Sequence, residues 1–348
     1  MPRILQISDL HFGPHYVPEA GEALQQIVPS LEADAIVVRG DLSQRAKRQQ
    51  FEDARRFIDR LPRVPMLVIP GNHDVPLYRI AERLLKPHAL YREIICPDLN
   101  PVLEIDGVVL AGIDSTSPRR TISNGRIHRE QLEHCEHIFA QASAGAVRIV
   151  VAHHHFAPGP DYLHDRTMPK ARRAIDCFVD QGVEMILGGH LHRSYIGNSL
   201  DFFPGNHRDR GIIIVQCGTS TSSRGRGRER NENTFNLIDA SAHFLTVIHY
   251  MYFEDRGEFA PVSQHQFPRP GCPFDPAHLV TTPPFPPLSV MTQVATVGWT
   301  KQKLLVLIMV VTAGAVLYWY VKNHVSLEEL VAQEERVRDA ISQRPWRS

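Results

Sequence analysis

The sequence has no excess of charge of either sign, little cysteine, and no long apolar run near its N-terminus. Its five cysteines are scattered and form no CxxC pair, which excludes a zinc knuckle and argues against a disulfide framework. Lysine plus arginine number 38, as do aspartate plus glutamate, and this balance argues weakly against a dedicated nucleic-acid binder. The first residues, MPRILQISDLHF, contain no signal-peptide core. We therefore expect the N-terminal part of the chain in a reducing cytoplasm.

Histidine is the residue type that stands out. The chain has 19 histidines among 348 residues, and histidine is the commonest metal ligand in proteins. The rest of the composition, 43% hydrophobic and 22% charged, is typical of a globular protein. The length is sufficient for one large domain or two modest ones.

Composition divides the chain into four parts. Residues 1–257 alternate short apolar runs with helical patterns, whereas residues 258–298 are rich in proline. A proline-rich stretch does not continue a helix and pairs poorly in a sheet, so it predicts an extended linker. Residues 299–322 are predicted to form a transmembrane helix, and residues 323–348 an amphipathic C-terminal tail.

The predicted transmembrane helix contains eighteen consecutive residues without a charge, Leu304–Val321. At about 1.5 Å per residue they span about 27 Å, close to the hydrocarbon thickness of a bilayer. Lysines flank the run, and tryptophan and tyrosine lie near its ends, as in interfacial aromatic belts. We expect a single-pass anchor in the cell membrane with the preceding domain in the cytoplasm. The numbers of Lys and Arg on the two sides are nearly equal and do not decide the orientation.

The N-terminal part carries the pattern of an α/β domain. Apolar runs typical of buried strands alternate with helical patterns, such as the apolar spacing of Phe51, Ala54, Ile58 and Leu61. In α/β domains, ligands bind beyond the C-terminal ends of the strands. The predicted strands are Ile4–Ile7, Ala35–Val38, Met66–Ile69, Val108–Ile113, Ile149–Ala152, Glu184–Leu187 and Ile212–Val215.

Polar clusters follow five of these predicted strands. They contain carboxylate, amide and imidazole side chains, a mixture that suits borderline divalent ions such as Mn²⁺, Fe²⁺ or Zn²⁺. Any one of them is common by itself, but all five in this order are hard to reach by chance. The clusters are Asp9-Leu-His11, Gly40-Asp41, Gly71-Asn72-His73-Asp74, His153-His154-His155 and Gly188-Gly189-His190-Leu-His192.

These clusters resemble the calcineurin-like metallophosphoesterase family, with its pattern D-x-H…G-D…G-N-H-[DE]…H…G-H-x-H. The resemblance covers roughly residues 1–239, and the GNHDVP and HHH segments are closest to the bacterial cyclic-nucleotide phosphodiesterase-like branch. It implies a four-layer αββα sandwich with two mixed sheets, here followed by the transmembrane helix. It also implies that residues 1–257 form a catalytic domain that holds two divalent metal ions.

The resemblance implies seven metal ligands, one of which is shared between the two ions. The shared ligand would be Asp41. The others would be Asp9, His11 and His192 for one ion, and Asn72, His154 and His190 for the second. A hydroxide bridging the two ions would then attack the phosphorus.

His73 would act at the leaving-group oxygen, as a general acid or as a stabiliser of developing charge. The histidine triplet leaves two candidates for one ligand. Family members often carry H-H-P, with the first histidine of that pair as the ligand, and Phe156 stands at the proline position, which favours His154 over His153. His155 either contacts substrate or only caps the strand.

Protein phosphatases of this superfamily carry G-D-x-x-D-R, whose second aspartate orients the catalytic histidine. Here Gln44 takes that position, so a protein-phosphatase role is disfavoured and the group that orients His73 is open. Arg45 is a candidate for binding a phosphate oxygen, with an exposed helix-opening arginine as the alternative. The arginine-rich segment 222–230 either covers the site or is a solvated loop, and the loop is slightly favoured.

The sequence thus predicts a hydrolase that uses two metals, with a small-molecule phosphodiester, such as a cyclic nucleotide, as substrate. The predicted anchor adds an alternative, a membrane-bound hydrolase of a nucleotide-linked or phospholipid substrate. A further alternative is a non-catalytic, membrane-tethered scaffold, but no ligand position is lost. We expect no nucleic-acid partner, and the sequence does not indicate an oligomeric state.

Overall fold

The computed structural model describes residues 1–120, 124–159, 167–203 and 211–272. All of them belong to one structural unit, Met1–Thr281. Its strands are β1 (Arg3–Ser8), β2 (Ala35–Arg39), β3 (Met66–Ile69), β4 (Val102–Ile105), β5 (Val108–Ile113), β6 (Val147–Ala152), β7 (Met185–Gly188), β8 (Tyr195–Asn198), β9 (Ile213–Gln216), β10 (Thr234–Ala240), β11 (Phe244–Phe253) and β12 (Glu258–Pro268). Its α-helices are α1 (Pro18–Ile27), α2 (Arg48–Ile58), α3 (Ile80–Leu85), α4 (Ala89–Ile94), α5 (Arg129–Gln141), α6 (Ala171–Asp180) and α7 (Ser199–Phe202), and short 3₁₀ turns occupy Val28–Leu31, Asn72–Asp74 and Gly227–Glu229.

The strands form two mixed six-stranded sheets. The first has the order β12-β11-β10-β1-β2-β3, and the second has the order β4-β5-β6-β7-β9-β8. β1, β2 and β3 run parallel to one another, as do β5, β6, β7 and β9. All seven strands predicted from the sequence are present, with ends that differ by a few residues at most. The central strands read as continuous apolar runs because both of their faces are buried.

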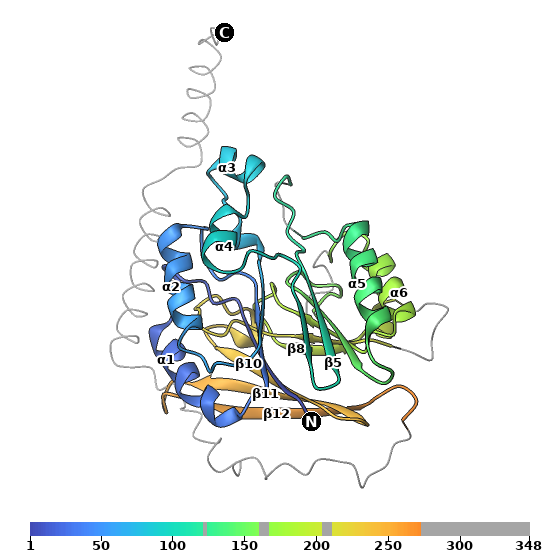
Figure 1. The fold of residues 1–348 in the computed structure, drawn as a ribbon. Helices are drawn as coiled ribbons and strands as arrows, with labels where there is room; N and C mark the ends of the chain where they lie inside the picture. Colours follow the sequence, from blue (N-terminus) through green and yellow to red (C-terminus); the bar gives the residue numbers. More distant parts are fainter. Residues whose placement is uncertain (121–123, 160–166, 204–210, 273–348) are drawn as a thin grey trace, which may run out of the picture. The chain divides into compact units, whose positions relative to one another are not determined.

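Three groups of buried apolar side chains show that the layers are α–β–β–α. One group packs α1 and α2 on the first sheet, and another packs α5 and α6 on the second. The third lies between the sheets, with Ile4 and Val37 from one and Ile149 and Leu187 from the other. Figure 1 shows α1 and α2 on one side of the strands and α5 and α6 on the other. The predicted fold class is confirmed for this part of the chain.

The predicted start of the linker at residue 258 is wrong. Glu258–Pro268 is the strand β12, which pairs antiparallel with β11 along its whole length. Pro261 and Pro268 are tolerated because β12 is the outermost strand of its sheet, where a missing N–H does not interrupt a ladder. Beyond the strand, Arg269 forms an ion pair with Glu184 at 2.8 Å. The folded domain therefore includes these residues.

The remaining C-terminal predictions fall on residues 273–348, outside the described part of the chain. This applies to the rest of the linker, the transmembrane helix at 299–322 and the tail at 323–348. Within the described ranges, none of the helices combines the length and the apolar character that a membrane span requires.

Candidate metal centre

The candidate ligands come from loops at the C-terminal ends of parallel strands in both sheets. Asp9, Asp41 and Asn72 follow β1, β2 and β3 of the first sheet, whereas His153 and His190 follow β6 and β7 of the second. Because the two sheets pack face to face, the five loops meet at one edge of the sandwich. The prediction that five strands deliver these groups to one edge is therefore confirmed.

Five of the candidate ligands have a backbone conformation that is unusual for residues other than glycine. Residues other than glycine rarely adopt positive φ, and such strain is concentrated at functional sites. The five are Asp9 (φ 53°), His11 (49°), Asp41 (50°), His190 (70°) and His192 (53°). The sharp turns at the strand ends thus point these side chains back over the edge of the sheets.

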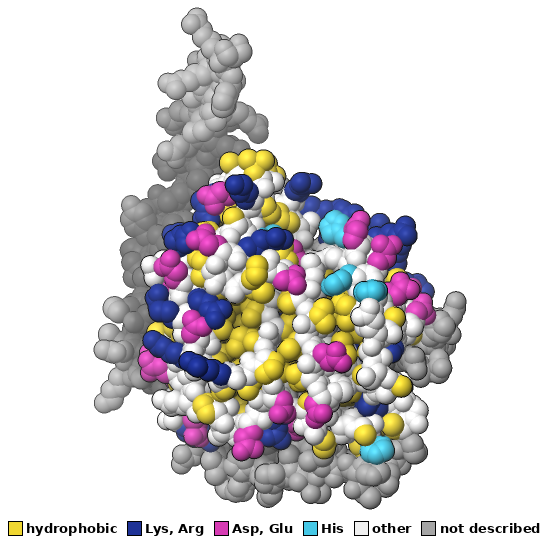
Figure 2. Space-filling model, viewed as in Figure 1, with side chains coloured by type: hydrophobic (Ala, Val, Ile, Leu, Met, Phe, Trp, Pro, Cys, Tyr) yellow, Lys and Arg dark blue, Asp and Glu magenta, His cyan; other side chains and the backbone are white. Residues whose placement is uncertain are grey.

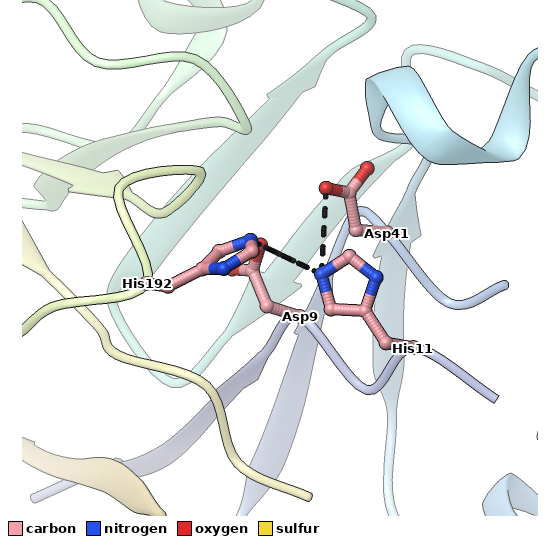
Figure 3. A group of neighbouring side chains, drawn as sticks. All are labelled: Asp9, His11, Asp41 and His192. Carbon is pink, nitrogen blue, oxygen red and sulfur yellow. Dashed lines mark hydrogen bonds and ion pairs between the residues drawn. The ribbon is translucent and has the colours of Figure 1, made fainter. Parts of the chain in front are cut away.

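The first ligand group contains two carboxylates and two imidazoles, all buried (Figure 3). The Nε2 atoms of His11 and His192 lie 3.1 Å apart. His192 Nε2 is 3.2 Å from Asp9 Oδ1, and His11 Nε2 is 3.7 Å from Asp41 Oδ2. Two imidazole nitrogens and two carboxylate oxygens therefore converge on one point, as a cation ligand set requires.

The second ligand group shares Asp41 with the first. His153 Nε2 lies 3.4 Å from Asp41 Oδ2 and 3.2 Å from Asn72 Oδ1. His190 Nδ1 lies 2.9 Å from the same amide oxygen. The structure thus brings together all the predicted ligands except one, with Asp41 between the two groups.

The exception is His154. At this ligand position the structure places His153. Along β6 the side chains of Val147, Ile149 and Val151 face the other sheet, and a strand alternates its faces with a period of two. His153 continues this face into the site. His154 continues the opposite face, and its Nδ1 lies 2.8 Å from the Ser115 hydroxyl oxygen. The prediction of His154 relied on Phe156 standing at the proline position of the H-H-P pattern. The alternation of side chains between the two faces of β6 was the better signal, and it indicates His153.

Two glycines allow the loops to approach closely. A Cβ at Gly71 would lie 2.3 Å from the backbone nitrogen of Asp41, and a Cβ at Gly40 would lie 2.2 Å from Nδ1 of His153. Either side chain would therefore push a shared or second-group ligand out of place.

The hydrogen bonds of the two aspartates fit a cation centre. Oδ2 of Asp9 accepts bonds from the Ser8 hydroxyl and from the backbone N–H of His190, and Oδ1 of Asp41 accepts one from the backbone N–H of His73 at 2.8 Å. The other oxygens, Asp9 Oδ1 and Asp41 Oδ2, are buried without a well-formed hydrogen bond and face the imidazoles. A buried carboxylate oxygen left in this state is costly unless a cation pairs with it.

The pKa values of three of these groups favour the protonation states that bind a metal ion. Burial raises the pKa of Asp41, but the imidazoles of His153 and His73 outweigh it and hold that pKa well below its usual range. Burial, together with the neighbouring histidines, lowers the pKa of His190 far below its ordinary value, and burial does the same for His11. Ionised carboxylates and neutral imidazoles are the forms that coordinate divalent ions. His153 differs, because burial lowers its pKa but the charges of Asp41 and Asp9 outweigh burial and raise that pKa above its ordinary value.

Asp74 was not among the predicted site residues, although it ends the GNHD segment. It accepts hydrogen bonds from the backbone N–H groups of Leu42, Ser43 and Gly71. These bonds tie the loop that carries Asp41 to the loop that carries Asn72. Burial and repulsion by Asp41 raise the pKa of Asp74 to about 7, against the effect of those hydrogen bonds.

His73 lies beside the first ligand group, with its ring edge-on to that of His11 at 4.8 Å. Its Nδ1 is 2.9 Å from the carbonyl oxygen of Gln44. A carbonyl only accepts, so Nδ1 carries the proton and Nε2 is left as an acceptor. The question of what orients His73 is thus answered by the backbone of Gln44, at the position where protein phosphatases carry a carboxylate.

Arg224 reaches the site from the arginine-rich segment 222–230. Its Nη1 donates to Nε2 of His73 at 3.2 Å and to Oε1 of Gln44 at 3.1 Å. Its carbonyl oxygen accepts a bond from Nδ1 of His192 at 3.0 Å, which leaves the Nε2 of that ligand free to face the centre. The solvated-loop interpretation is therefore wrong at this residue, whereas Arg226, Arg228 and Arg230 are exposed.

A cavity of about 280 Å³ opens beside the second ligand group and includes Asn72 and His73 in its lining. Arg45 and Arg83 also line it, so its walls are cationic. Arg45 lines this cavity, and its contact with a phosphate oxygen stays a prediction. His155 is buried and stacks on the ring of His190 at 5.7 Å, so its contact with substrate stays a prediction. A larger cavity, of about 490 Å³, is lined by none of the candidate ligands.

The fold and the site together define a class, an αββα sandwich with an acid- and histidine-lined centre at the edge where the loops of its two sheets meet. A family model for calcineurin-like phosphoesterases matches residues 2–194, more than half of the chain. The chain therefore belongs to the calcineurin-like phosphoesterase family, and this membership supports a phosphoric ester hydrolase.

Solved structures share the fold at low identity. A purple acid phosphatase from yellow lupin (Lupinus luteus) seeds is similar at 13% identity and a TM-score of 0.60, over 78% of this chain and 54% of that one. PhoD is similar at 12% identity and a TM-score of 0.53, over 76% of this chain and 72% of that one. The chain thus spans about half the length of the lupin enzyme. None of the curated protein sequences matches the chain.

Proposed function

We propose that this protein hydrolyses a phosphodiester at a centre of two divalent metal ions. The observation that carries the proposal is the position of Asp41. Its buried carboxylate faces both ligand groups, with Oδ2 3.7 Å from Nε2 of His11 and 3.4 Å from Nε2 of His153. One carboxylate set between two imidazole-rich groups is the arrangement that a pair of cations needs.

The first ion would be held by Asp9, His11, His192 and Asp41, and the second by Asp41, Asn72, His153 and His190. The mixture of imidazole and oxygen donors supports Mn²⁺, Fe²⁺ or Zn²⁺ over Mg²⁺ or Ca²⁺. Such a pair of ions supplies a nucleophile at neutral pH and neutralises charge on the phosphoryl oxygens. The amide of Asn72 keeps the second group less negative, which suits a site that must admit an anion.

We assign the handling of the substrate to His73 and Arg224. In the absence of substrate, Arg224 Nη1 donates to His73 Nε2. A phosphoryl oxygen that entered the site would accept that N–H instead. The freed Nε2 of His73 would then take up a proton and donate it to the leaving-group oxygen, while the bond from Nδ1 to the Gln44 carbonyl keeps the ring in place. Arg45 and Arg83 would attract the anion into the adjoining cavity.

The preference for a diester over a monoester comes from the resemblance of the GNHD and HHH segments to the cyclic-nucleotide phosphodiesterase-like branch. A cyclic nucleotide is thus one candidate substrate. A nucleotide-linked or phospholipid substrate is the alternative, and the predicted membrane anchor supports it, because a small soluble substrate does not require its enzyme at a membrane.

The test is hydrolysis of bis(p-nitrophenyl) phosphate by the full-length chain supplied with Mn²⁺. We expect D41N to lose roughly a thousandfold or more in kcat/KM and to bind fewer than two ions per chain, since a shared ligand serves both positions. D106N is the matched control, because Asp106 is exposed in a turn where positive φ tolerates asparagine. Activity that survives both D41N and a chelator would overturn the metal mechanism. An inactive wild-type chain that binds metal would favour the scaffold.

We also propose that residues 299–322 anchor the protein in the cell membrane and leave the catalytic domain in the cytoplasm. The support is the uncharged run Leu304–Val321 with its flanking lysines and aromatic residues. Fractionation of the full-length chain and of a chain ending at Leu288 tests this. If both remain equally soluble without detergent, the anchor does not exist.

A further inference from the structure

The exposed apolar side chains of the domain are concentrated in one short segment. Seven large hydrophobic side chains are exposed among the described residues, and five of them fall within residues 77–85. They are Leu77 (42% exposed), Tyr78 (76%), Ile80 (66%), Leu84 (48%) and Leu85 (80%). Figure 2 shows apolar side chains gathered at the top of the molecule, over the position of α3 in Figure 1. We call residues 77–86 the apolar lip.

Polar contacts hold the lip on the domain, and its apolar side chains do not. The helix α3 has no buried residue. The guanidinium of Arg83 donates to the carbonyl oxygens of Pro76 and Arg120, and that of Arg79 donates to the carbonyl oxygen of Ala46. The backbone is thus fixed while the apolar groups face outward. A contiguous apolar patch kept exposed in this way marks an interaction surface.

The charges around the lip are mainly positive. The segment carries Arg79, Arg83 and Lys86 against one acid, Glu82, which is paired with Arg79 at 2.8 Å. Two exposed arginines, Arg119 and Arg120, lie on the loop that Arg83 contacts. Exposed leucine, isoleucine and tyrosine side chains among arginines and lysine are the combination that inserts into the interface of an anionic bilayer. A neutral or basic partner surface would not match these charges.

The lip also borders the candidate metal centre. Leu77 and Arg83 line the same cavity as Asn72 and His73. The guanidinium of Arg45, which lines that cavity as well, lies 5.7 Å from the centre of the Tyr78 ring. A surface on which the lip is seated would therefore face the mouth of the site.

We propose that the apolar lip docks on an anionic membrane surface and holds the mouth of the metal centre against the lipid headgroups. The lip makes this contact through the catalytic domain itself, separately from the predicted anchor at 299–322. The apolar side chains enter the interfacial layer, and the cations around them pair with anionic headgroups.

The test is hydrogen–deuterium exchange of the full-length chain with vesicles of phosphatidylcholine alone and of phosphatidylcholine with phosphatidylglycerol. The amides of residues 77–86 are expected to exchange about tenfold more slowly with the anionic vesicles, because lipid then excludes water from the segment. High salt should reduce this protection. The doubly substituted variant L84D/L85D should lose it, while K86Q should weaken vesicle binding of the lip by about fivefold.

The matched control is V102D, since Val102 is 43% exposed on β4 and lies outside residues 77–86. V102D should keep the protection at 77–86. The soluble substrate bis(p-nitrophenyl) phosphate shows that L84D/L85D is folded, because neither leucine lines the cavity and its hydrolysis should stay within about twofold of wild type.

Three results would overturn the proposal. One is equal exchange of residues 77–86 with and without anionic vesicles. Another is protection of residues 77–86 by vesicles of phosphatidylcholine that is as strong as the protection by anionic vesicles. The third is protection in the absence of any vesicle that disappears in a chain ending at Leu288, since the C-terminal segment would then be the occupant. None of these measurements requires hydrolysis, so their failure would leave the proposed phosphodiesterase activity standing.

Discussion

The two sheets contribute different chemistry to the candidate centre. The loops of the first sheet supply both carboxylates and the amide, Asp9, Asp41 and Asn72, together with His11. The loops of the second sheet supply imidazoles alone, His153, His190 and His192. Neither set suits a pair of borderline cations without the other, because a carboxylate set favours hard ions and an imidazole set lacks the charge to neutralise two cations. The centre is therefore a product of the packing between the sheets.

The largest expected effect comes from removing charge on the first sheet. We expect D9N to empty the first metal position and lower kcat roughly a thousandfold, because the group would lose one of its two carboxylates and keep only Asp41 beside the buried imidazoles. Metal analysis and hydrolysis of bis(p-nitrophenyl) phosphate measure this. A D9N chain that retained two ions would show that Asp41 and the imidazoles hold the first ion without the carboxylate of Asp9.

On the second sheet, the expected contrast lies between neighbouring histidines. H153A should lose the second ion and about a hundredfold in kcat, since His153 Nε2 faces Asp41 and Asn72. H154Q alters the hydrogen bond to Ser115. This variant should keep both ions, and its free energy of unfolding should fall by about 1 kcal/mol. If the metal content fell in H154Q and not in H153A, the assignment of His153 would be wrong.

Packing between the sheets should also depend on pH through His249 on β11. Burial, with a smaller contribution from the charge of His265, lowers the pKa of His249 to about 4. The unfolded chain, with an ordinary histidine pKa near 6.5, therefore binds the proton more readily, so this contribution to stability is present above pH 6.5 and is lost as the pH falls toward 4. The loss is about 2 kcal/mol at pH 5.

Denaturant unfolding of the metal-free, full-length chain at pH 5 and pH 7 measures this difference. H249Q should reduce it by about 2 kcal/mol and leave the metal content at pH 7 unchanged, because the cavity that His249 lines contains none of the ligands. An unchanged pH dependence in H249Q would assign the acid sensitivity to other groups.

The smallest effect is expected where a loop of the second sheet touches the first. Arg224 follows β9 and donates to His73 and Gln44, which follow β3 and β2. R224Q should lower kcat/KM about tenfold with both ions retained, since it removes a donor to the phosphoryl oxygen. R230Q, at an exposed arginine of the same loop, is the control. Equal activities of the two variants would show that Arg224 does not contribute to catalysis.

Much of this centre could be predicted because its strands are buried on both faces and end in short polar clusters. Those strands read as continuous apolar runs, and parallel strands bring their C-terminal ends to one edge. The choice between His153 and His154 was also available, since Val147, Ile149 and Val151 mark the face that His153 continues. The register argument from a proline position used a weaker signal.

Other features depend on contacts that no local pattern contains. Arg224 is 151 residues from His73 in the sequence, and its neighbours in the segment are exposed arginines of the same type. The G-N-H-[DE] pattern marks Asp74 as an acid, but not that it accepts hydrogen bonds from the backbone N–H groups of two loops. The strand β12 was missed because proline is a poor strand residue in general, and only the position of β12 at the edge of its sheet makes Pro261 acceptable.

The positive φ angles at Asp9, His11, Asp41, His190 and His192 have a consequence for engineering. Each left-handed, non-glycine residue costs roughly 1 kcal/mol that glycine would not. H11G or H192G would relieve this cost, but each would also delete a buried imidazole, and the cavity left behind costs more than the strain. Relieving the strain at these positions would thus not stabilise the chain, and engineered variants of this protein must be screened with its metal ions bound.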